Sequence, residues 1–582
     1  MTTQGLSLIL PGLVGLLLGV LRGQTELVLL SLAVLIWMAA EWTMFKWRVW
    51  FELPQIEIER EVNGRSEPKG LLWAGRTVTV DVRVTMRGNG PRVSTSLGPT
   101  IVFRDVIPEN MEVLSKSENG EGGGNQFEHR TRCSTVSFRY TARVRAAGLV
   151  ELPGVRLQLQ DGQGFFLAER FIKRPQAFRV LPAFADAGDA RPLVKRTNSI
   201  PQHGIHRLQR SGMGSELLEL RDYVVGDPPK SIAWKVSARR GKLMTRQYES
   251  EVPVRVQLYI DGSIGTRIGG YGCRLLDQML YVGASVARSA ISVGDPVGAT
   301  LMDERDITRL PPLAGERGFH RLLEAMAEFS VDLAPPPVPL TPALMQMALK
   351  YAADRHPELL DRRVNLPPPT LFPILPFSRR RFRQRCLLAG VLTEIFQLSM
   401  TDNVRLIHDD RLLAKQAQRF LMQCGMPWME PVMAPRGSKA WLGLPRMEML
   451  ASALAKGVIH ARDNEVFVIF VELHECVPGL STLLPAVKMA LGRHHRVTVV
   501  CPSPTFRRPV ASSTEPQSES VDDLVAAAEQ IRTRDLMSRL QRELRRIGAS
   551  VTCSGEKEAV QLVLSEMELA RTGRLSSAGT RR

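Results

Sequence analysis

The hydrophobic pattern of the chain changes three times, and each change predicts a different kind of structure. Residues 6–21 and 27–40 are uncharged apolar runs separated by a short polar break. From about residue 53 to 185, apolar and polar residues alternate with period two, which is the pattern of half-buried strands. Beyond residue 254, continuously apolar strands alternate with amphipathic helices. We therefore expect a multidomain chain of 582 residues rather than one hydrophobic core.

The two apolar runs predict a transmembrane helical hairpin within residues 1–50. Each run is near the lower length limit for crossing a bilayer. Three tryptophans between Trp42 and Trp50, together with Lys46 and Arg48, follow the second run and are typical of a membrane interface. Because basic residues favour the cytoplasmic side, we expect most of the chain to be cytoplasmic. A signal peptide is the alternative, although the first residues lack Lys and Arg.

Residues 51–185 predict a β-sandwich of immunoglobulin-like type. Four alternating segments begin at residues 56, 77, 135 and 154, and strands at this spacing are typical of a small two-sheet domain. A fold does not by itself give a function. The expected role of this domain is that of a spacer or packing platform.

Residues 254–571 predict an α/β domain built on a doubly wound parallel sheet. Strands are expected at 254–260, 296–302, 466–473, 496–502 and 549–553, and helices at 276–294, 445–456, 482–492, 521–546 and 556–570. The segment from about 335 to 450 exceeds what such a sheet needs. We interpret it as a largely helical insertion, serving either as a packed cap or as a docking surface. Residues 572–582 predict a disordered basic tail.

Residues 186–253 hold an unusually dense charge pattern. The candidate residues of this core motif are Glu216, Arg221, Asp222, Asp227, Trp234, Lys235, Arg239, Arg246 and Glu249. Charges beside a buried strand are costly unless they are paired. We therefore expect Arg221, Lys235 and Arg239 to bind the neighbouring carboxylates. Such a partly buried network would hold the motif on the α/β sheet.

This motif resembles the bacterial domain-of-unknown-function 58 family. The matching elements are Gly212-x-Gly-x-Glu216, Leu220-Arg-x-Tyr223, Gly226-Asp227, Ile232-x-Trp-Lys235 and Tyr248-Glu249. The Asp-x-Ser strand end that follows looks like a von Willebrand factor type A (vWA) domain. The resemblance implies a protein of the bacterial inner membrane, often encoded beside a MoxR-type AAA+ ATPase. It implies a scaffold or adaptor for that ATPase in envelope or complex assembly.

Asp261 and Ser263 are the candidate metal ligands. The vWA pattern that the resemblance implies is Asp-x-Ser-x-Ser, with a Thr and a further Asp from later loops, because a hard divalent cation needs oxygen ligands. Here Gly265 replaces the second Ser, residues 311–320 offer no Thr, and the fourth strand ends in Glu472-Leu-His-Glu475. We expect a degenerate, empty site and no cofactor, with Mg²⁺ binding as the alternative.

Composition narrows the classes of function. The net charge of +17 favours a membrane lipid surface or an acidic partner, and no nucleic-acid-binding motif accompanies it. The seven cysteines form no Cys-x-x-Cys pair, which argues against a disulfide framework or a zinc site. No P-loop, Gly-x-Ser-x-Gly or His-Glu-x-x-His motif occurs.

Two alternative functions stay open. One is a metal-dependent ligand-binding or adhesion module that uses Asp261 and Ser263. The other is an enzyme centred on Arg221, Asp227 and Glu249. The predicted main function is instead a non-enzymatic one.

Overall fold

The protein forms two compact units in the computed structural model. The first contains Met1–Val180 and Ala334–Glu430, and the second contains Leu181–Leu333 and Pro431–Arg582. The chain therefore passes between the units three times. The structure describes residues 3–52, 56–66, 69–86, 100–114, 126–129, 135–185, 207–251, 254–303, 307–331, 339–360, 376–426, 428, 444–461, 465–502, 521–553 and 555–571. The predicted basic tail, 572–582, lies outside the described residues.

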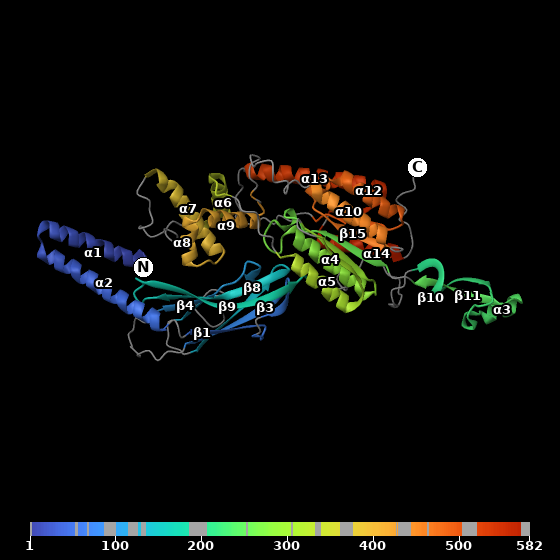
Figure 1. Ribbon diagram of the computed structural model, residues 1–582, viewed down its shortest axis with the longest axis horizontal. Coiled ribbons are helices and arrows are strands. Elements are labelled where there is room, and N and C mark those ends of the chain that lie inside the picture. Colours follow the sequence, from blue (N-terminus) through green and yellow to red (C-terminus); the bar gives the residue numbers. More distant parts are fainter. Residues whose placement is uncertain are drawn as a thin grey trace, which may run out of the picture. The chain divides into compact units, whose positions relative to one another are not determined.

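The first unit begins with two antiparallel helices, α1 (Thr3–Arg22) and α2 (Thr25–Glu52) (Figure 1). Glycines let them approach closely: a Cβ at Gly15 would lie 2.6 Å from the Ser31 hydroxyl, and one at Gly19 would lie 2.8 Å from a Val28 methyl. Among the described helices, one segment, Thr25–Trp47, is long and apolar enough to cross a membrane. The apolar part of α1 is shorter, so the prediction of two spanning helices is supported for one of them.

The predicted β-rich domain consists of two antiparallel sheets. One has the order β1-β3-β7-β5 and the other β2-β9-β8-β4-β6. The strands are β1 (Ile56–Val62), β2 (Lys69–Trp73), β3 (Thr77–Met86), β4 (Thr100–Asp105), β5 (Met111–Val113), β6 (Gln126–His129), β7 (Thr135–Val144), β8 (Gly148–Gln160) and β9 (Leu167–Leu181). Alternating valines of β3 are buried while the residues between them are more exposed, as the period-two pattern predicted.

A buried ion pair joins the two sheets. The Arg60 guanidinium, on β1, donates to the Asp105 carboxylate, on β4, and to two main-chain carbonyl oxygens. The Tyr140 hydroxyl, on β7, donates to the same carboxylate at 2.6 Å. All three side chains are almost fully buried. Since a buried charge needs a partner and hydrogen bonds, this triad specifies how the two sheets meet.

The helices of the predicted insertion pack on the β-sheet domain. They are α6 (Pro342–Arg355), η4 (Pro357–Leu360), α7 (Pro376–Ile395), α8 (Met400–His408) and α9 (Asp410–Gln423). The Ile107 amide donates to the Gln397 side chain at 3.2 Å, Arg156 donates to the Gln397 carbonyl, and Arg419 pairs with Glu109 at 2.9 Å. This segment is inserted in the sequence of the α/β domain, yet it belongs to the other unit.

The second unit contains a six-stranded sheet with the order β14-β13-β12-β15-β16-β17. Its strands are β12 (Arg255–Asp261), β13 (Val297–Met302), β14 (Ile307–Leu313), β15 (Glu465–Phe470), β16 (Arg496–Val500) and β17 (Ser550–Thr552). Five strands are parallel, but β14 pairs with β13 antiparallel. The five strands predicted from the sequence are the parallel ones, whereas β14 was not predicted. It runs antiparallel because a connection as short as 303–306 cannot make a parallel crossover.

Helices cover both faces of this sheet, as predicted for a doubly wound fold (Figure 1). The helices α4 (Leu275–Ser292), α5 (Gly315–Phe329) and α14 (Glu556–Arg571) are on one face. On the other are α10 (Leu444–His460), α12 (Leu480–Gly492) and α13 (Val521–Ile547), while the short α11 (Leu473–Cys476) follows β15. Buried apolar side chains of α10, α12 and α13 share one core with β15 and β16.

The charged motif forms a separate two-stranded sheet. Strands β10 (Arg207–Asp222) and β11 (Met244–Glu251) are antiparallel and pair with each other. Between them lie η2 (Pro229–Ser231) and the short helix α3 (Trp234–Arg240). The pattern of charges in the sequence did not predict this hairpin.

We expect Asp105→Ala to destabilise the first unit by about 3–5 kcal/mol, because it leaves the buried Arg60 charge without its partner. The matched control is Asp81→Ala, which removes the carboxylate of an exposed pair with Arg139 and should cost about 0–1 kcal/mol. Urea unfolding of the purified full chain in detergent measures both. Equal losses in the two variants would contradict a structural role for the buried pair.

Candidate functional site

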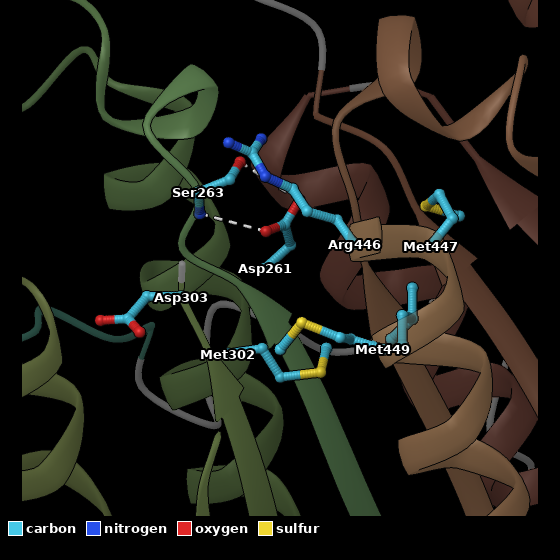
Figure 2. Close-up of a pocket in the computed structure, with 8 residues that line it drawn as sticks. Asp261, Ser263, Met302, Asp303, Arg446, Met447 and Met449 are labelled. Carbon is cyan, nitrogen blue, oxygen red and sulfur yellow. Dashed lines mark hydrogen bonds between the residues drawn. The ribbon is translucent and has the colours of Figure 1, made fainter. Parts of the chain in front are cut away.

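The site predicted at Asp261 and Ser263 lies where β12 ends. Asp261 Oδ1 accepts a hydrogen bond from the Ser263 amide at 3.0 Å, and the Ser263 hydroxyl is 3.4 Å from Asp261 Oδ2 (Figure 2). Such a bond from an aspartate to the backbone two residues later holds a tight turn. Asp261 therefore caps the turn after its strand. The next strand in the sheet, β15, ends beside it, at the place where open α/β sheets bind ligands.

Glu472 occupies the position facing Gly265. A Cβ built on Gly265 would lie 2.3 Å from Glu472 Oε2, far inside contact distance. The glycine that replaces the second Ser is thus the feature that admits this carboxylate. The sequence pattern showed that an oxygen was missing at Gly265, but it did not show that Glu472 supplies one from another strand end.

Three carboxyl groups and one guanidinium converge here. Burial, the neighbouring Glu475 and Asp261 raise the pKa of Glu472 to about 7, while Arg446 acts in the opposite direction. Arg446 itself pairs with Glu475 at 2.7 Å. Glu472 consequently changes its protonation state near neutral pH. A carboxyl group with such a pKa can accept or donate a proton or a hydrogen bond.

A small pocket opens beside these groups, and three of its eight lining residues are methionines. Its empty space, including the open mouth, is about 340 Å³. The lining residues are Asp261, Ser263, Met302, Asp303, Arg446, Met447, Met449 and Leu450. Figure 2 shows that they come from the ends of two strands and from α10. Methionine side chains adapt their shape to a partner, so the pocket suits an apolar group bordered by charge.

Asp261 and Ser263 are the metal ligands expected from the sequence. In the part of the chain that the structure describes, no group of three or more His, Cys, Asp or Glu side chains is placed to hold a metal ion. Residues 311–320, considered for a Thr ligand, belong to the end of β14 and the start of α5. The oxygens of Asp261 and Ser263 bond to each other instead.

The charged motif brings Arg221 and Asp227 together. Arg221 donates to Asp227 Oδ1 at 2.6 Å, and the Val224 amide and the Thr245 hydroxyl each donate to Oδ2 at 3.2 Å. The Val224 amide, the Arg221 side chain and the Thr245 hydroxyl lower the pKa of Asp227. The carboxylate therefore ties the loop after β10 to both strands of the hairpin.

The wider network predicted for this motif is wrong in its extent. Trp234, Lys235 and Arg239 all lie on α3 and are exposed, with 64% of Trp234 accessible. The contacts of Asp227 given above stay within the hairpin, so they brace its loop and do not attach it to the six-stranded sheet. Glu216 and Glu249 lie on β10 and β11, and their side chains are outside the described part.

Three cysteines that are far apart in the sequence meet in the core. Cys476, Cys501 and Cys553 follow β15, β16 and β17, and each is less than 10% exposed. Hydrogen bonds with the other two thiols, together with burial, raise the pKa of Cys501. Sequence spacing alone could not reveal this group, because it depends on the order of the strands. The buried thiols pack as small apolar groups.

Residues 219–365 match the family model described as "Protein of unknown function DUF58". This stretch of the chain belongs to the DUF58 family. The match begins in β10 and covers the braced loop, α3, β12 and the turn at Asp261. The family predicted from the charged motif is therefore confirmed. The DUF58 segment includes the hairpin from residue 219 onward and the part of the sheet-edge site that follows β12 and β13.

Curated relatives of this chain carry names without an assigned activity. The chain is 24% identical to "Uncharacterized protein YeaD" of Bacillus subtilis over 40% of its own length and 56% of that protein. It is 28% identical to "Uncharacterized protein Rv1480" of Mycobacterium tuberculosis over 27% of its length and 47% of that protein. The match spans about half the length of these relatives.

Similarity to solved structures is slight. A fragment of alpha-2-macroglobulin from Escherichia coli aligns at 18% identity with a TM-score of 0.15, over 22% of this chain and 23% of the other. A score this low carries no argument about fold or function.

We expect Glu472→Gln to alter how stability depends on pH. The ordinary glutamate pKa is 4.5 and the folded value is about 7, so between these values the folded protein holds a proton that the unfolded chain loses. Wild-type stability should therefore fall as the pH rises from 4.5 to 7 and then level off. The variant should lack this fall and be more stable than the wild type by up to about 3 kcal/mol at pH 8.

Denaturant unfolding at a series of pH values from 5 to 8 tests this expectation. Glu558→Gln, which changes an exposed glutamate on α14, is the matched control and should follow the wild-type curve. Glu472 would be ionised across this range, against our expectation, if the stability of the wild type stayed constant or rose between pH 5 and 7 and the Gln variant gave the same curve.

Proposed function

We propose that this protein is a membrane-anchored scaffold or adaptor that works with a MoxR-type AAA+ ATPase in envelope or complex assembly. The observation that carries the proposal is the position of Glu472 against Gly265. Glu472 fills, with the chain's own side chain, the space beside Gly265 at the sheet edge. We take this as support for a role in holding a partner.

The sheet supports a vWA-like assignment for the second unit. Its five parallel strands and the switch point between β12 and β15 support this assignment, which the DUF58 resemblance implies. We assign the two-sheet domain of the first unit to the immunoglobulin-like type, and we propose that it serves as a spacer. We assign the ATPase partner from the family resemblance alone.

The tryptophans of α2 support the anchoring role of the N-terminal helices. Trp42 and Trp47 lie at the C-terminal end of the apolar segment Thr25–Trp47, and tryptophan suits the membrane interface. We propose on this basis that both helices cross the inner membrane. The aromatic contacts of Phe45 with Phe166 and of Trp37 with Phe165, each with ring centroids 5.8 Å apart, attach the turn 161–166 to α2.

The alternatives have less support. A metal-dependent adhesion module would need oxygen ligands beyond Asp261 and Ser263. Glu472 lies beside Gly265, but the described residues contain no group of three or more His, Cys, Asp or Glu side chains placed to hold a metal ion. An enzyme centred on Arg221, Asp227 and Glu249 would need reactive groups that are free to act. The Asp227 carboxylate accepts three hydrogen bonds that brace its loop.

The first test of the proposal uses ATP hydrolysis. The affinity-tagged full chain, purified from membranes in mild detergent, should retain the MoxR-type ATPase of the same organism and change its rate of ATP hydrolysis at least 2-fold. Reconstitution from the two purified proteins is the decisive measurement. An unrelated membrane protein with the same tag is the control, and an ATPase that neither binds nor changes rate would refute the partnership.

The second test concerns topology. We expect a reporter fused after Arg582 to be active only when it is one that functions in the cytoplasm, because the basic flank after α2 favours that side. A paired fusion at Gly23, between α1 and α2, should report the periplasm. Periplasmic activity of the C-terminal fusion would exclude a cytoplasmic ATPase as the partner.

A further inference from the structure

The loop of the β10–β11 hairpin presents apolar side chains to solvent. We define the hairpin tip as residues 223–243, the segment between the two strands. Within it Val225 is 94% exposed, Trp234 64% and Val224 58%. Exposed apolar residues scattered singly are normal, but three in one short loop favour a binding surface. The tip is therefore the part of the DUF58 segment that most resembles a contact surface.

The conformation of the loop keeps Val225 exposed. The Asp227 amide donates to the Val224 carbonyl at 3.1 Å, closing a turn in which Gly226 has φ +113°, a value that favours glycine. Arg221 and Thr245 then hold Asp227 from the strands. Val225 consequently stands at the corner of a braced turn, and little conformational entropy remains to be lost when a partner binds it.

The helix α3 is braced in the same way. The Ser237 hydroxyl donates to the Ala233 carbonyl at 3.0 Å and accepts from the Met244 amide at 2.8 Å. Ala233, Ser237 and Met244 are buried beneath the helix. Trp234 on its outer face thus stays exposed on a fixed support.

Charge defines the chemistry of the partner. The tip contains five basic residues, all exposed, and one acidic residue, Asp227, which is already paired with Arg221. The basic residues are Lys230, Lys235, Arg239, Arg240 and Lys242. A surface of this kind attracts an acidic partner and gains specificity from its charges. Tryptophan and arginine are also the residues that most often dominate binding energy at protein interfaces.

We infer that the hairpin tip is a protein-docking surface whose partner offers an apolar groove with an acidic rim. Val225 and Trp234 fill the groove, and the lysines and arginines of the tip meet the rim. If the proposed function holds, this partner is the MoxR-type ATPase, and that identification rests on the proposed function. The docking surface itself rests only on the geometry and charge of the tip.

Binding of the purified MoxR-type ATPase to the full chain in nanodiscs tests the inference. Val225→Asp and Trp234→Ala should each weaken binding at least 10-fold, and Lys235→Glu at least 3-fold. Raising the salt concentration should weaken binding of the wild type and reduce the difference in affinity between the wild type and Lys235→Glu. The matched control is Ile531→Asp, which places a charge at another exposed β-branched residue, 71% accessible on α13, and should leave binding unchanged.

The outcomes separate the two proposals. If the wild type binds the ATPase and the tip variants bind equally well, the docking inference is wrong while the proposed function stands. If the tip variants instead lose attachment to anionic-lipid nanodiscs and keep the ATPase, the surface belongs to the membrane and the inference is also overturned.

If the wild type does not bind the ATPase, the proposed function falls, and a photocrosslinker at position 225 in cells then decides the inference. A crosslink to an acidic protein that is lost in Trp234→Ala, and whose binding is reproduced with the purified partner, supports docking. Absence of such a partner refutes it.

Discussion

Strands β12 and β15 lie side by side and in register, with Val256 beside Val466 and Ile260 beside Phe470. A long stretch of chain separates these two strands in the sequence. Part of it forms β13 and β14, which extend the sheet on one side of β12. A later part forms the helices α6–α9, which belong to the other unit. The pairing therefore determines where that chain must return. It also creates the switch point at which Asp261 and Glu472 meet, because parallel strands end at the same edge of a sheet.

Charged side chains have three different structural roles in this protein. Arg60 and Asp105 are buried and hydrogen bonded to each other and to neighbouring groups, so they link the two sheets. Arg221 and Asp227 are partly exposed and hold a loop in one conformation. Glu472 stands among other carboxyl groups, and its raised pKa lowers the cost of burying it near neutral pH. The solvent exposure of a charged side chain, and the groups that bond to it, determine which of these roles it has.

The charged motif illustrates why a dense pattern of charges is ambiguous in a sequence. Pairing of Arg221 with Asp227 agreed with the expectation that such charges need partners. Arg239 and Lys235 have the same charge and lie nearby in the sequence, yet they are exposed on α3. The difference arises from the hairpin, whose strands turn Arg221 toward the loop and whose short helix turns the other two outward. A basic surface and a structural network cannot be separated until that geometry is known.

From the sequence alone we predicted the parallel strands and five of the helices of the α/β domain, but not β14 or α5, and four strand segments of the β-sheet domain. These predictions succeeded because periodicity along a strand or helix is a local property. The sequence also identified the DUF58 segment, whose residues are close together in the chain. Only the tertiary structure decided that Glu472 faces Gly265, that Cys476, Cys501 and Cys553 meet, and that the inserted helices pack on the sandwich. Each of these contacts joins residues that are distant in sequence. They depend on strand order and on the absence of a single Cβ, and neither leaves a periodic signal along the chain.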